Sequence, residues 1–157
     1  MVFNEENLDQ LLPDVEAITK RHYNDVATYK DIPLDPDFEK YRLIESVGNT
    51  RCYTIRDDVG LLKGYAVFFL SYSLQYKSSY QAVQDLIYID SELRGQGIGK
   101  DFILFVDNHL RDEGVQLVFH HTKVAKSFAP LLEHIGYSHV DSIYARRLDL
   151  CVPEQSL

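Results

Sequence analysis

A glycine-rich turn over residues 94–100 constrains the fold of this chain more than any other segment. It reads Arg-Gly-Gln-Gly-Ile-Gly-Lys, follows an apolar run over residues 80–89 and precedes apolar residues at helical spacing. When a strand passes through closely spaced glycines into a helix, unpaired backbone N–H groups are exposed at the positive end of the helix dipole, where a phosphate group can bind. The same turn without a ligand is a tight strand-to-helix connection, and the glycines alone leave both interpretations open.

The spacing of the glycines argues against two well-known phosphate loops. A dinucleotide-binding loop that begins at Gly95 requires glycine or alanine where the chain has Lys100, and an acidic residue about twenty positions further on is not evident. A P-loop that ends at Lys100 requires glycine and then serine or threonine where the chain has Arg94 and Asp101. The spacing therefore weakens an NAD site and excludes an ATP site of the P-loop kind.

The first third of the chain predicts two helices. Apolar residues at helical spacing indicate a helix over residues 11–23, with Pro13 in its first turn. A second helix is expected after Asp35, a good N-cap, with Pro36 at its first position and with Tyr41 on its apolar face. This helix is expected to end at Gly48.

The rest of the chain predicts strands first and then helices that alternate with strands, which is typical of an α/β (α+β) fold. The expected strands cover residues 51–56, 61–73, 80–89, 115–120 and one or two segments within 137–150. The expected helices cover residues 97–113 and 124–135, with Pro130 either kinking the second one or marking its true start.

Length and composition indicate one globular domain over residues 1–150 and a disordered tail over residues 151–157. The net charge of −8 repels a phosphate backbone, so nucleic acid is not expected as a partner; acidity suits a cationic acceptor but is also a common solubility feature. Cys52 and Cys151 lack the spacing of a metal site, so we expect no metal and two reduced, inert thiols. No leader pattern or long apolar run is present, which favours a cytoplasmic protein without a membrane segment.

The turn and its flanks carry a family resemblance. Residues 94–99 resemble the Arg/Gln-x-x-Gly-x-Gly/Ala signature of the GNAT acetyltransferases. Residues 85–90 resemble the strand that precedes this signature in the family, and residues 128–137, which end Leu-Glu-His-Ile-Gly-Tyr, resemble its later helix-Gly-aromatic segment. The resemblance covers residues 51–148 well and the N-terminal helices loosely. It implies a mixed, mostly antiparallel sheet flanked by about four helices, with strands splayed around a CoA site. The segment 85–148 is also similar to GNAT members encoded by bacteriophages.

The same resemblance implies an activity and a binding site. The activity is transfer of an acetyl group from acetyl-CoA, as co-substrate, to a primary amine of a small molecule or a protein. The backbone of Ile87, Tyr88 and Ile89 is implied to pair with the pantetheine arm as an added strand. The residues implied to bind the pyrophosphate are Arg94, Gly95, Gln96, Gly97, Ile98, Gly99 and Lys100.

Acetyl transfer to an amine requires a neutral nucleophile and hence a base. The resemblance implies Asp85 as that base, because it matches an acidic residue that several family members use; a structural hydrogen-bond acceptor is the alternative. His121 is the second catalytic candidate, as base, acid or CoA partner, and a histidine satisfied by backbone groups is its alternative. Strand alternation sends His120 and His121 to opposite faces, so we expect one of them to face the cofactor. His22 falls where the family forms its acceptor pocket.

Leu132 departs from the family pattern, because the matching position usually holds a tyrosine that protonates the leaving thiolate. Tyr144 and His121 are candidate substitutes. The departure also supports a different function, namely a catalytically weak GNAT-fold module that binds CoA or acts through protein contacts. A homodimer is an open alternative to a monomer.

Overall fold

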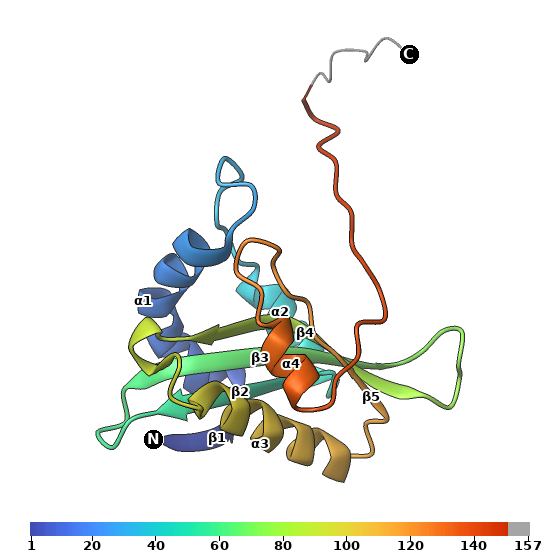
Figure 1. The fold of residues 1–157 in the computed structure, drawn as a ribbon, viewed down its shortest axis with the longest axis horizontal. Helices are drawn as coiled ribbons and strands as arrows, with labels where there is room; N and C mark the ends of the chain where they lie inside the picture. The colour runs from blue at the N-terminus through green and yellow to red at the C-terminus, as the bar shows by residue number, and fades with distance from the viewer. Residues whose placement is uncertain (151–157) are drawn as a thin grey trace.

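A five-stranded sheet in the order β1-β2-β3-β4-β5 organises the computed structural model, which describes residues 1–150 (Figure 1). Neighbouring strands from β1 to β4 are antiparallel, and β5 is parallel to β4. The predicted mixed, mostly antiparallel sheet is therefore confirmed. The strands are β1 (Val2–Glu6), β2 (Thr50–Arg56), β3 (Leu62–Tyr72), β4 (Tyr80–Ile89) and β5 (Leu117–Phe119).

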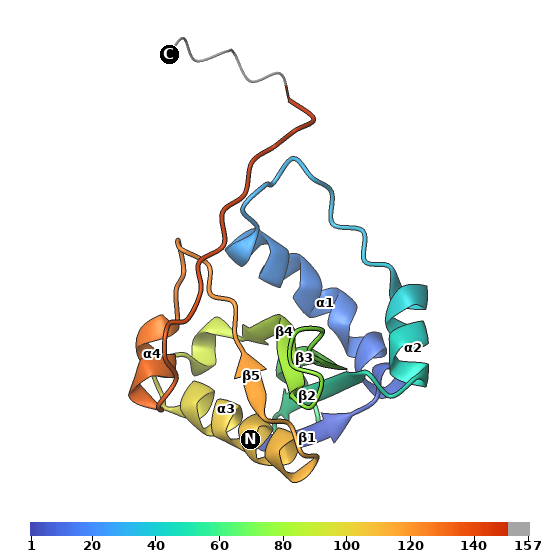
Figure 2. The ribbon, with the colours of Figure 1, turned by 90° about the vertical axis from the view of Figure 1, so that its right-hand side faces the viewer.

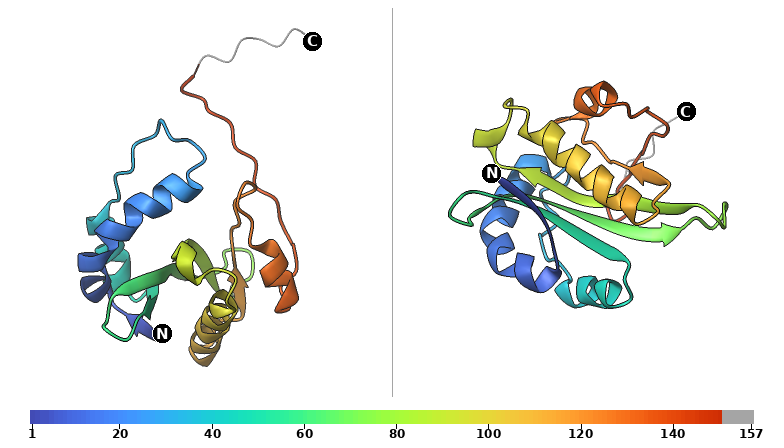
Figure 3. Two further views of the ribbon diagram at one scale, coloured as in Figure 1. Left: turned by 60° about the vertical axis from the view of Figure 1, so that its left-hand side comes forward. Right: turned by 90° about the horizontal axis from the view of Figure 1, so that it is seen from below.

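Helices cover both faces of the sheet. They are α1 (Leu8–Val26), α2 (Phe38–Ser46), α3 (Ile98–Asp112) and α4 (Ala129–His134), and a 3-10 turn, Ser91–Leu93, joins β4 to the glycine-rich turn. Seen from below, α1 and α2 lie on one face of the sheet and α3 and α4 on the other (Figure 3, right). No helix within residues 1–150 is long and apolar enough to cross a membrane.

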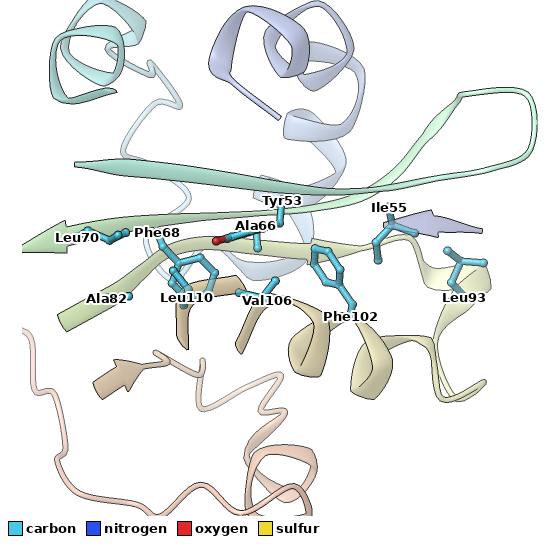
Figure 4. Close-up of a cluster of buried hydrophobic side chains, with 10 residues drawn as sticks. All are labelled: Tyr53, Ile55, Ala66, Phe68, Leu70, Ala82, Leu93, Phe102, Val106 and Leu110. Carbon is cyan, nitrogen blue, oxygen red and sulfur yellow. The ribbon is translucent and has the colours of Figure 1, made fainter. Parts of the chain in front are cut away.

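Each face of the sheet has its own apolar cluster. The cluster under α3 is drawn in Figure 4 and consists of Tyr53, Ile55, Ala66, Phe68, Leu70, Ala82, Leu93, Phe102, Val106 and Leu110. The cluster under α1 consists of Leu8, Leu11, Val15, Ile18, Cys52, Leu62, Tyr65, Val67 and Tyr88. Alternate residues of β2 and β3 enter opposite clusters, as the two-residue period of a strand requires.

The N-terminal elements differ from the predicted ones. The sequence pattern missed β1, and α1 begins earlier because the Asn7 side chain accepts from the Gln10 backbone N–H while the Gln10 side chain accepts from that of Asn7. Pro13 therefore lies inside the helix rather than in its first turn. Similarly, α2 begins later than predicted because Asp37, rather than Asp35, caps it through the Lys40 N–H.

The C-terminal elements are shorter than predicted. Pro130 marks the true start of α4, and the closing strands expected within residues 137–150 do not form in the described chain. This segment instead leaves the body of the molecule in an extended conformation (Figures 1 and 2). Cys52 is a free, buried thiol, and burial raises its pKa to about 12, as expected of an inert cysteine. Cys151 and the predicted tail, 151–157, lie outside the described residues.

Two leucines of α3 test the position of the core. Leu110 is fully buried, at 0% exposure, whereas Leu104 is 37% exposed on the same helix. We expect Leu110→Ala to lower the free energy of unfolding by about 2–5 kcal/mol and Leu104→Ala by less than about 1 kcal/mol, since only the former opens a cavity. Urea unfolding of both variants measures the difference, and equal losses would contradict the assignment of the buried face.

Candidate functional site

A β-bulge interrupts β4 at Asp85. Val67 of β3 lies opposite Leu86, and Phe68 lies opposite Gln84, so Asp85 has no Cα partner on the described length of β3. The side chains confirm the extra residue. Before Asp85 the even-numbered side chains of β4 pack in the apolar cluster under α3, and after Asp85 the odd-numbered ones do. A bulge of this kind bends the strand and increases its twist.

The bulge lies where β4 and β5 separate. Backbone pairing with β5 covers only Gln81, Ala82 and Val83, although β4 continues to Ile89. Beyond Val83 the Gln84 side chain takes over from backbone pairing in connecting β4 to the residues after β5. Its Oε1 lies 2.7 Å from His120 Nδ1, and its Nε2 donates to the His121 carbonyl at 3.4 Å. Residues 85–89 are consequently left with a backbone edge that no strand within residues 1–150 covers. An extended ligand can pair with such an edge as a strand would.

The glycine-rich turn leads from the end of β4 into α3. Gly95 and Gly97 have φ values of 77° and 82°, a left-handed conformation that strains any other residue. Gly97 is the N-cap of α3, and none of the described side chains caps this end of the helix. The first helical bond is donated by Asp101 to the Gly97 carbonyl, so the preceding N–H groups remain available to a ligand. Apart from the glycine's own atoms and its chain neighbours, no atom of the described chain lies within 4 Å of a Cβ built on Gly95 or Gly97, so a ligand can approach the backbone here.

Both the free edge and the turn border one cavity of about 1080 Å³, which lies between the sheet, α1 and the loop before α4. This volume is slightly above the range of about 300–1,000 Å³ that is typical of small-molecule sites. Asp85, His121 and all the residues implied to bind CoA except Gln96 and Ile98 line the cavity. Gln96 instead donates from its side chain to the Glu92 carbonyl at 2.6 Å, and Ile98 packs against the cluster under α3.

Cations gather at the turn end of the cavity, although the whole chain is acidic. Arg94, Lys100, Lys123 and Lys126 all line it. The Arg94 guanidinium donates to the Ile89 carbonyl at 3.0 Å and to Asp25 of α1 at 3.1 Å. The latter hydrogen bond lowers the pKa of the Asp25 carboxyl. Uncapped amides and four cations together form a favourable site for a phosphorylated ligand.

Asp85 lines the cavity and accepts a hydrogen bond from the Tyr41 hydroxyl of α2. Burial first, and then the bond to Asp85, raise the pKa of Tyr41 well above its usual value, so the hydroxyl stays protonated and acts as the donor. The sequence pattern placed Tyr41 on an apolar face and gave no sign of this contact. A hydroxyl that donates to a carboxylate fixes the direction of its oxygens.

The neighbouring histidines point to different environments, as strand alternation predicts. His121 is exposed and lines the cavity. His120 packs against the rings of Phe68, Phe128 and Tyr137, and burial lowers its pKa to about 4. In the described part of the chain its Nε2 has no hydrogen-bond partner. Of the two, His121 is the one that a bound ligand can reach.

His22 of α1 lines the same cavity. Its Nδ1 lies 2.9 Å from the Tyr65 hydroxyl, and its ring centroid lies 5.1 Å from that of Tyr88. Burial lowers the pKa of His22 to about 4, so the ring is neutral at pH 7. The predicted position of His22 beside the acceptor space is compatible with this placement.

Leu132, at the position of the family's usual acid, and its two candidate substitutes, Tyr144 and His121, lie in different environments. Leu132 is buried on α4 and brings no polar atom to the cavity. Tyr144 is 93% exposed on the C-terminal segment and does not line the cavity, so its suggested role as a substitute acid is wrong for this arrangement. His121 remains as the candidate within reach. Residues 1–150 contain no group of His, Cys, Asp and Glu side chains that could hold a metal ion.

No protein-family model and no curated protein matches the chain. Solved structures do match over nearly their full length. Glucosamine-6-phosphate N-acetyltransferase from Arabidopsis thaliana is 15% identical, with a TM-score of 0.69 over 95% of this chain and 100% of that one. A transcriptional regulator from Bacillus halodurans C-125 is 17% identical, with a TM-score of 0.74 over 93% and 98% of the two chains.

A predicted acetyltransferase from Clostridium acetobutylicum, solved with acetyl-CoA, is 13% identical and has a TM-score of 0.68 over 94% of this chain and 96% of that one. At these identities the likeness concerns the fold. The chain therefore has the GNAT acetyltransferase fold that the sequence resemblance implied.

Burial of His22 predicts that stability depends on pH. The pKa of His22 is about 4 in the folded chain and about 6.5 in the unfolded chain, so the unfolded chain binds more protons between pH 4 and pH 6.5. Stability is therefore lost as the pH falls through this window, by on the order of 2–3 kcal/mol from this group. We expect His22→Gln to flatten the fall in unfolding free energy between pH 7 and pH 4.5, measured by urea titration.

Other acidic and histidine groups contribute to the same fall, so a matched variant is needed. His134→Gln changes an exposed histidine at the end of α4 and should keep the wild-type slope. If the His22→Gln slope equals that of the wild type, His22 is not buried in its neutral form.

Proposed function

We propose that this chain transfers an acetyl group from acetyl-CoA to a primary amine of a small molecule or a protein. The observation that carries the proposal is the uncovered edge of β4 next to the uncapped turn of α3, both within one cavity. The GNAT fold, which the chain shares with N-acetyltransferases, supports it.

The chain offers matching groups for each part of CoA. The backbone of Ile87, Tyr88 and Ile89 would pair with the amide groups of the pantetheine arm, as an added strand does. The backbone N–H groups from Gly95 to Lys100 would hold the pyrophosphate, with the cations of the cavity completing its charge balance. When bound, acetyl-CoA supplies a thioester that activates the acetyl group toward a nucleophile.

Asp85 and His121 would move the protons. The Asp85 carboxylate accepts the proton of the attacking amine, directly or through a water, and Tyr41 holds this carboxylate toward the cavity. His121, which lines the same cavity, donates a proton to the leaving sulfur. It takes the role of the family's tyrosine, whose position holds Leu132 in this chain. Tyr41 is a positioning residue in this scheme, because it acts through Asp85.

A second candidate function is a module that binds CoA but catalyses little or no transfer. The observation that favours it is the apolar, buried side chain of Leu132 where the family pattern has a tyrosine. The two functions differ in turnover rather than in CoA binding. Release of free thiol from acetyl-CoA in the presence of a panel of primary amines separates them.

Two glycines at the ends of α3 test CoA binding. Gly97 and Gly114 have φ values of 82° and 87°, and a Cβ built at either position meets no atom within 4 Å apart from the adjoining residues. Alanine therefore adds similar backbone strain at both sites, but only Gly97 borders the cavity. We expect Gly97→Ala to weaken CoA binding by about tenfold or more in isothermal titration calorimetry, which corresponds to about 1.4 kcal/mol.

Gly114→Ala should lose similar stability and keep the wild-type affinity for CoA. Equal affinities of the two variants would remove the turn from the site. If the unaltered chain does not bind CoA at all, both candidate functions fail.

Substitutions at Asp85 and Tyr41 test the proton acceptor. We expect Asp85→Asn to lower kcat by about 10²–10⁴-fold while CoA affinity is unchanged, because a base acts in the chemical step. Tyr41→Phe should lower kcat by roughly tenfold, the size expected of one hydrogen bond to a charged group. Asp112→Asn, on the far end of α3, is the matched control and should leave turnover unchanged. Wild-type turnover by Asp85→Asn would show that another group takes the proton.

A further inference from the structure

Three large apolar side chains are exposed on one side of the cavity. Ile32 is 47% exposed, Leu34 43% and Phe38 38%, and all three line the cavity. Ile32 and Leu34 belong to the loop that joins α1 to α2, which Figure 2 shows, and Phe38 begins α2. We name these three residues the apolar wall. Exposed apolar side chains that gather at a cavity are typical of a ligand-binding surface.

The apolar wall lies next to the Asp85 carboxylate. Tyr41, which donates to Asp85, follows Phe38 by three residues on α2, so both side chains lie on the same side of this helix, and both line the cavity. The apolar cluster under α1, against which Tyr41 packs, also borders the cavity through Leu11 and Val15. A molecule whose amine lies at Asp85 therefore has apolar side chains around the rest of it.

Charges are distributed unevenly over the cavity. Every described cation that lines it comes from residues 94–126, around the glycine-rich turn and in the loop before α4. Before Asp85 the described lining contains one ionised side chain, Asp35, and His22 is neutral at pH 7. An acceptor with a phosphate or carboxylate group finds no cation on this side. A polyamine would bring further ammonium groups into apolar surroundings, which is costly.

Polar contacts hold the loop that carries the apolar wall. The Tyr23 hydroxyl donates to the Ile32 carbonyl at 2.6 Å, and the Ile32 N–H donates to the Tyr29 carbonyl at 3.2 Å. Asp31 pairs with Arg147 at 2.8 Å. The wall is therefore formed before a ligand arrives, and a preformed surface lowers the entropy that binding costs.

We propose that the acceptor is a primary monoamine with one apolar substituent, alkyl or aryl, which packs against the apolar wall while the amine lies at Asp85. This rests on the proposed acetyl transfer and names the acceptor class for it. In that reaction the amine nitrogen bonds to the acetyl carbon as the C–S bond of the thioester breaks. The proton of the amine passes to Asp85, and the sulfur takes a proton and leaves as the free thiol.

A series of straight-chain amines tests the acceptor class, because their amino groups have nearly the same pKa and they differ in apolar length. We expect kcat/KM for thiol release from acetyl-CoA to rise about fourfold with each added CH₂ between ethylamine and hexylamine. Phenethylamine should be acetylated about as well as hexylamine, and spermidine and phosphoethanolamine at least about tenfold less well. A flat series, or a preference for either polar amine, would overturn the acceptor class and leave acetyl transfer standing.

Two exposed leucines provide a matched pair of variants. Leu34 belongs to the apolar wall, whereas Leu43 is 66% exposed on α2 and does not line the cavity. Leu34→Asn should raise KM for hexylamine by roughly threefold to tenfold, with kcat and the KM for ethylamine little changed, because only hexylamine is long enough to reach the wall. Leu43→Asn should behave as the wild type. Equal KM values for hexylamine in the two variants would remove the apolar wall from the site.

A longer donor distinguishes an acceptor substituent from an acyl chain at the apolar wall. If hexanoyl-CoA is preferred to acetyl-CoA with ethylamine as acceptor, and Leu34→Asn removes this preference, the wall binds the acyl chain and the proposal is wrong.

A binding measurement covers the case in which the chain acetylates no amine. Hexylamine is then titrated into the chain at saturating CoA in a calorimeter. Binding that Leu34→Asn weakens and Leu43→Asn does not would support an apolar monoamine as the ligand of this site, although acetyl transfer has failed. Absence of binding would overturn the proposal together with the transfer.

Discussion

Asp85 is an extra residue in β4, and the arrangement of the cavity depends on what this insertion does to the strand. It ends the pairing with β5 after Val83, so the backbone that follows is free on one side. It also directs the Asp85 carboxylate toward Tyr41 of α2, on the opposite face from α3. One local irregularity thus supplies both an edge for a strand-like ligand and a carboxylate beside it.

Gln84 stabilises the point where the strands separate. Where two parallel strands separate, backbone N–H and C=O groups lose their partners and need other hydrogen bonds. Here the Gln84 side-chain amide contacts the His120 ring and the His121 carbonyl. His120 is thereby fixed in an apolar pocket, which leaves His121 directed toward the cavity. The pairs of Asp25 with Arg94 and Lys126 then join the end of α1 to the glycine-rich turn and to the loop before α4. These pairs are partly exposed, so salt is expected to weaken them.

The sequence predicted the elements that local patterns determine. The strands between residues 50 and 120, the glycine-rich turn and α3 follow from apolar spacing and from the spacing of the glycines, and they were found nearly as expected. The bulge at Asp85 was not predictable, because it depends on register with β3 rather than on any local residue choice. Tyr41 illustrates the same limit, since its spacing fits an apolar face while its hydroxyl finds Asp85 across the fold.

Elements that need a distant partner were also misjudged. β1 is short and lacks a clear alternation of apolar and polar residues. It pairs with β2, which follows only after α1 and α2, so this pairing leaves little trace in the sequence. Residues 137–150 have the composition of strands but find no partner in the described chain. Competing N-caps were equally ambiguous, since Asp35 and Asp37 both suit the start of α2 and the structure uses the second.

The central claim is that the free edge of β4 and the turn before α3 form one CoA site. Amide chemical shifts of the isotope-labelled chain, followed residue by residue during a titration with CoA, test it most directly. We predict that the largest changes occur at residues 86–89 and 95–100, with β1 and α2 little affected. An unchanged spectrum, or changes confined to β1 and α2, would contradict the account.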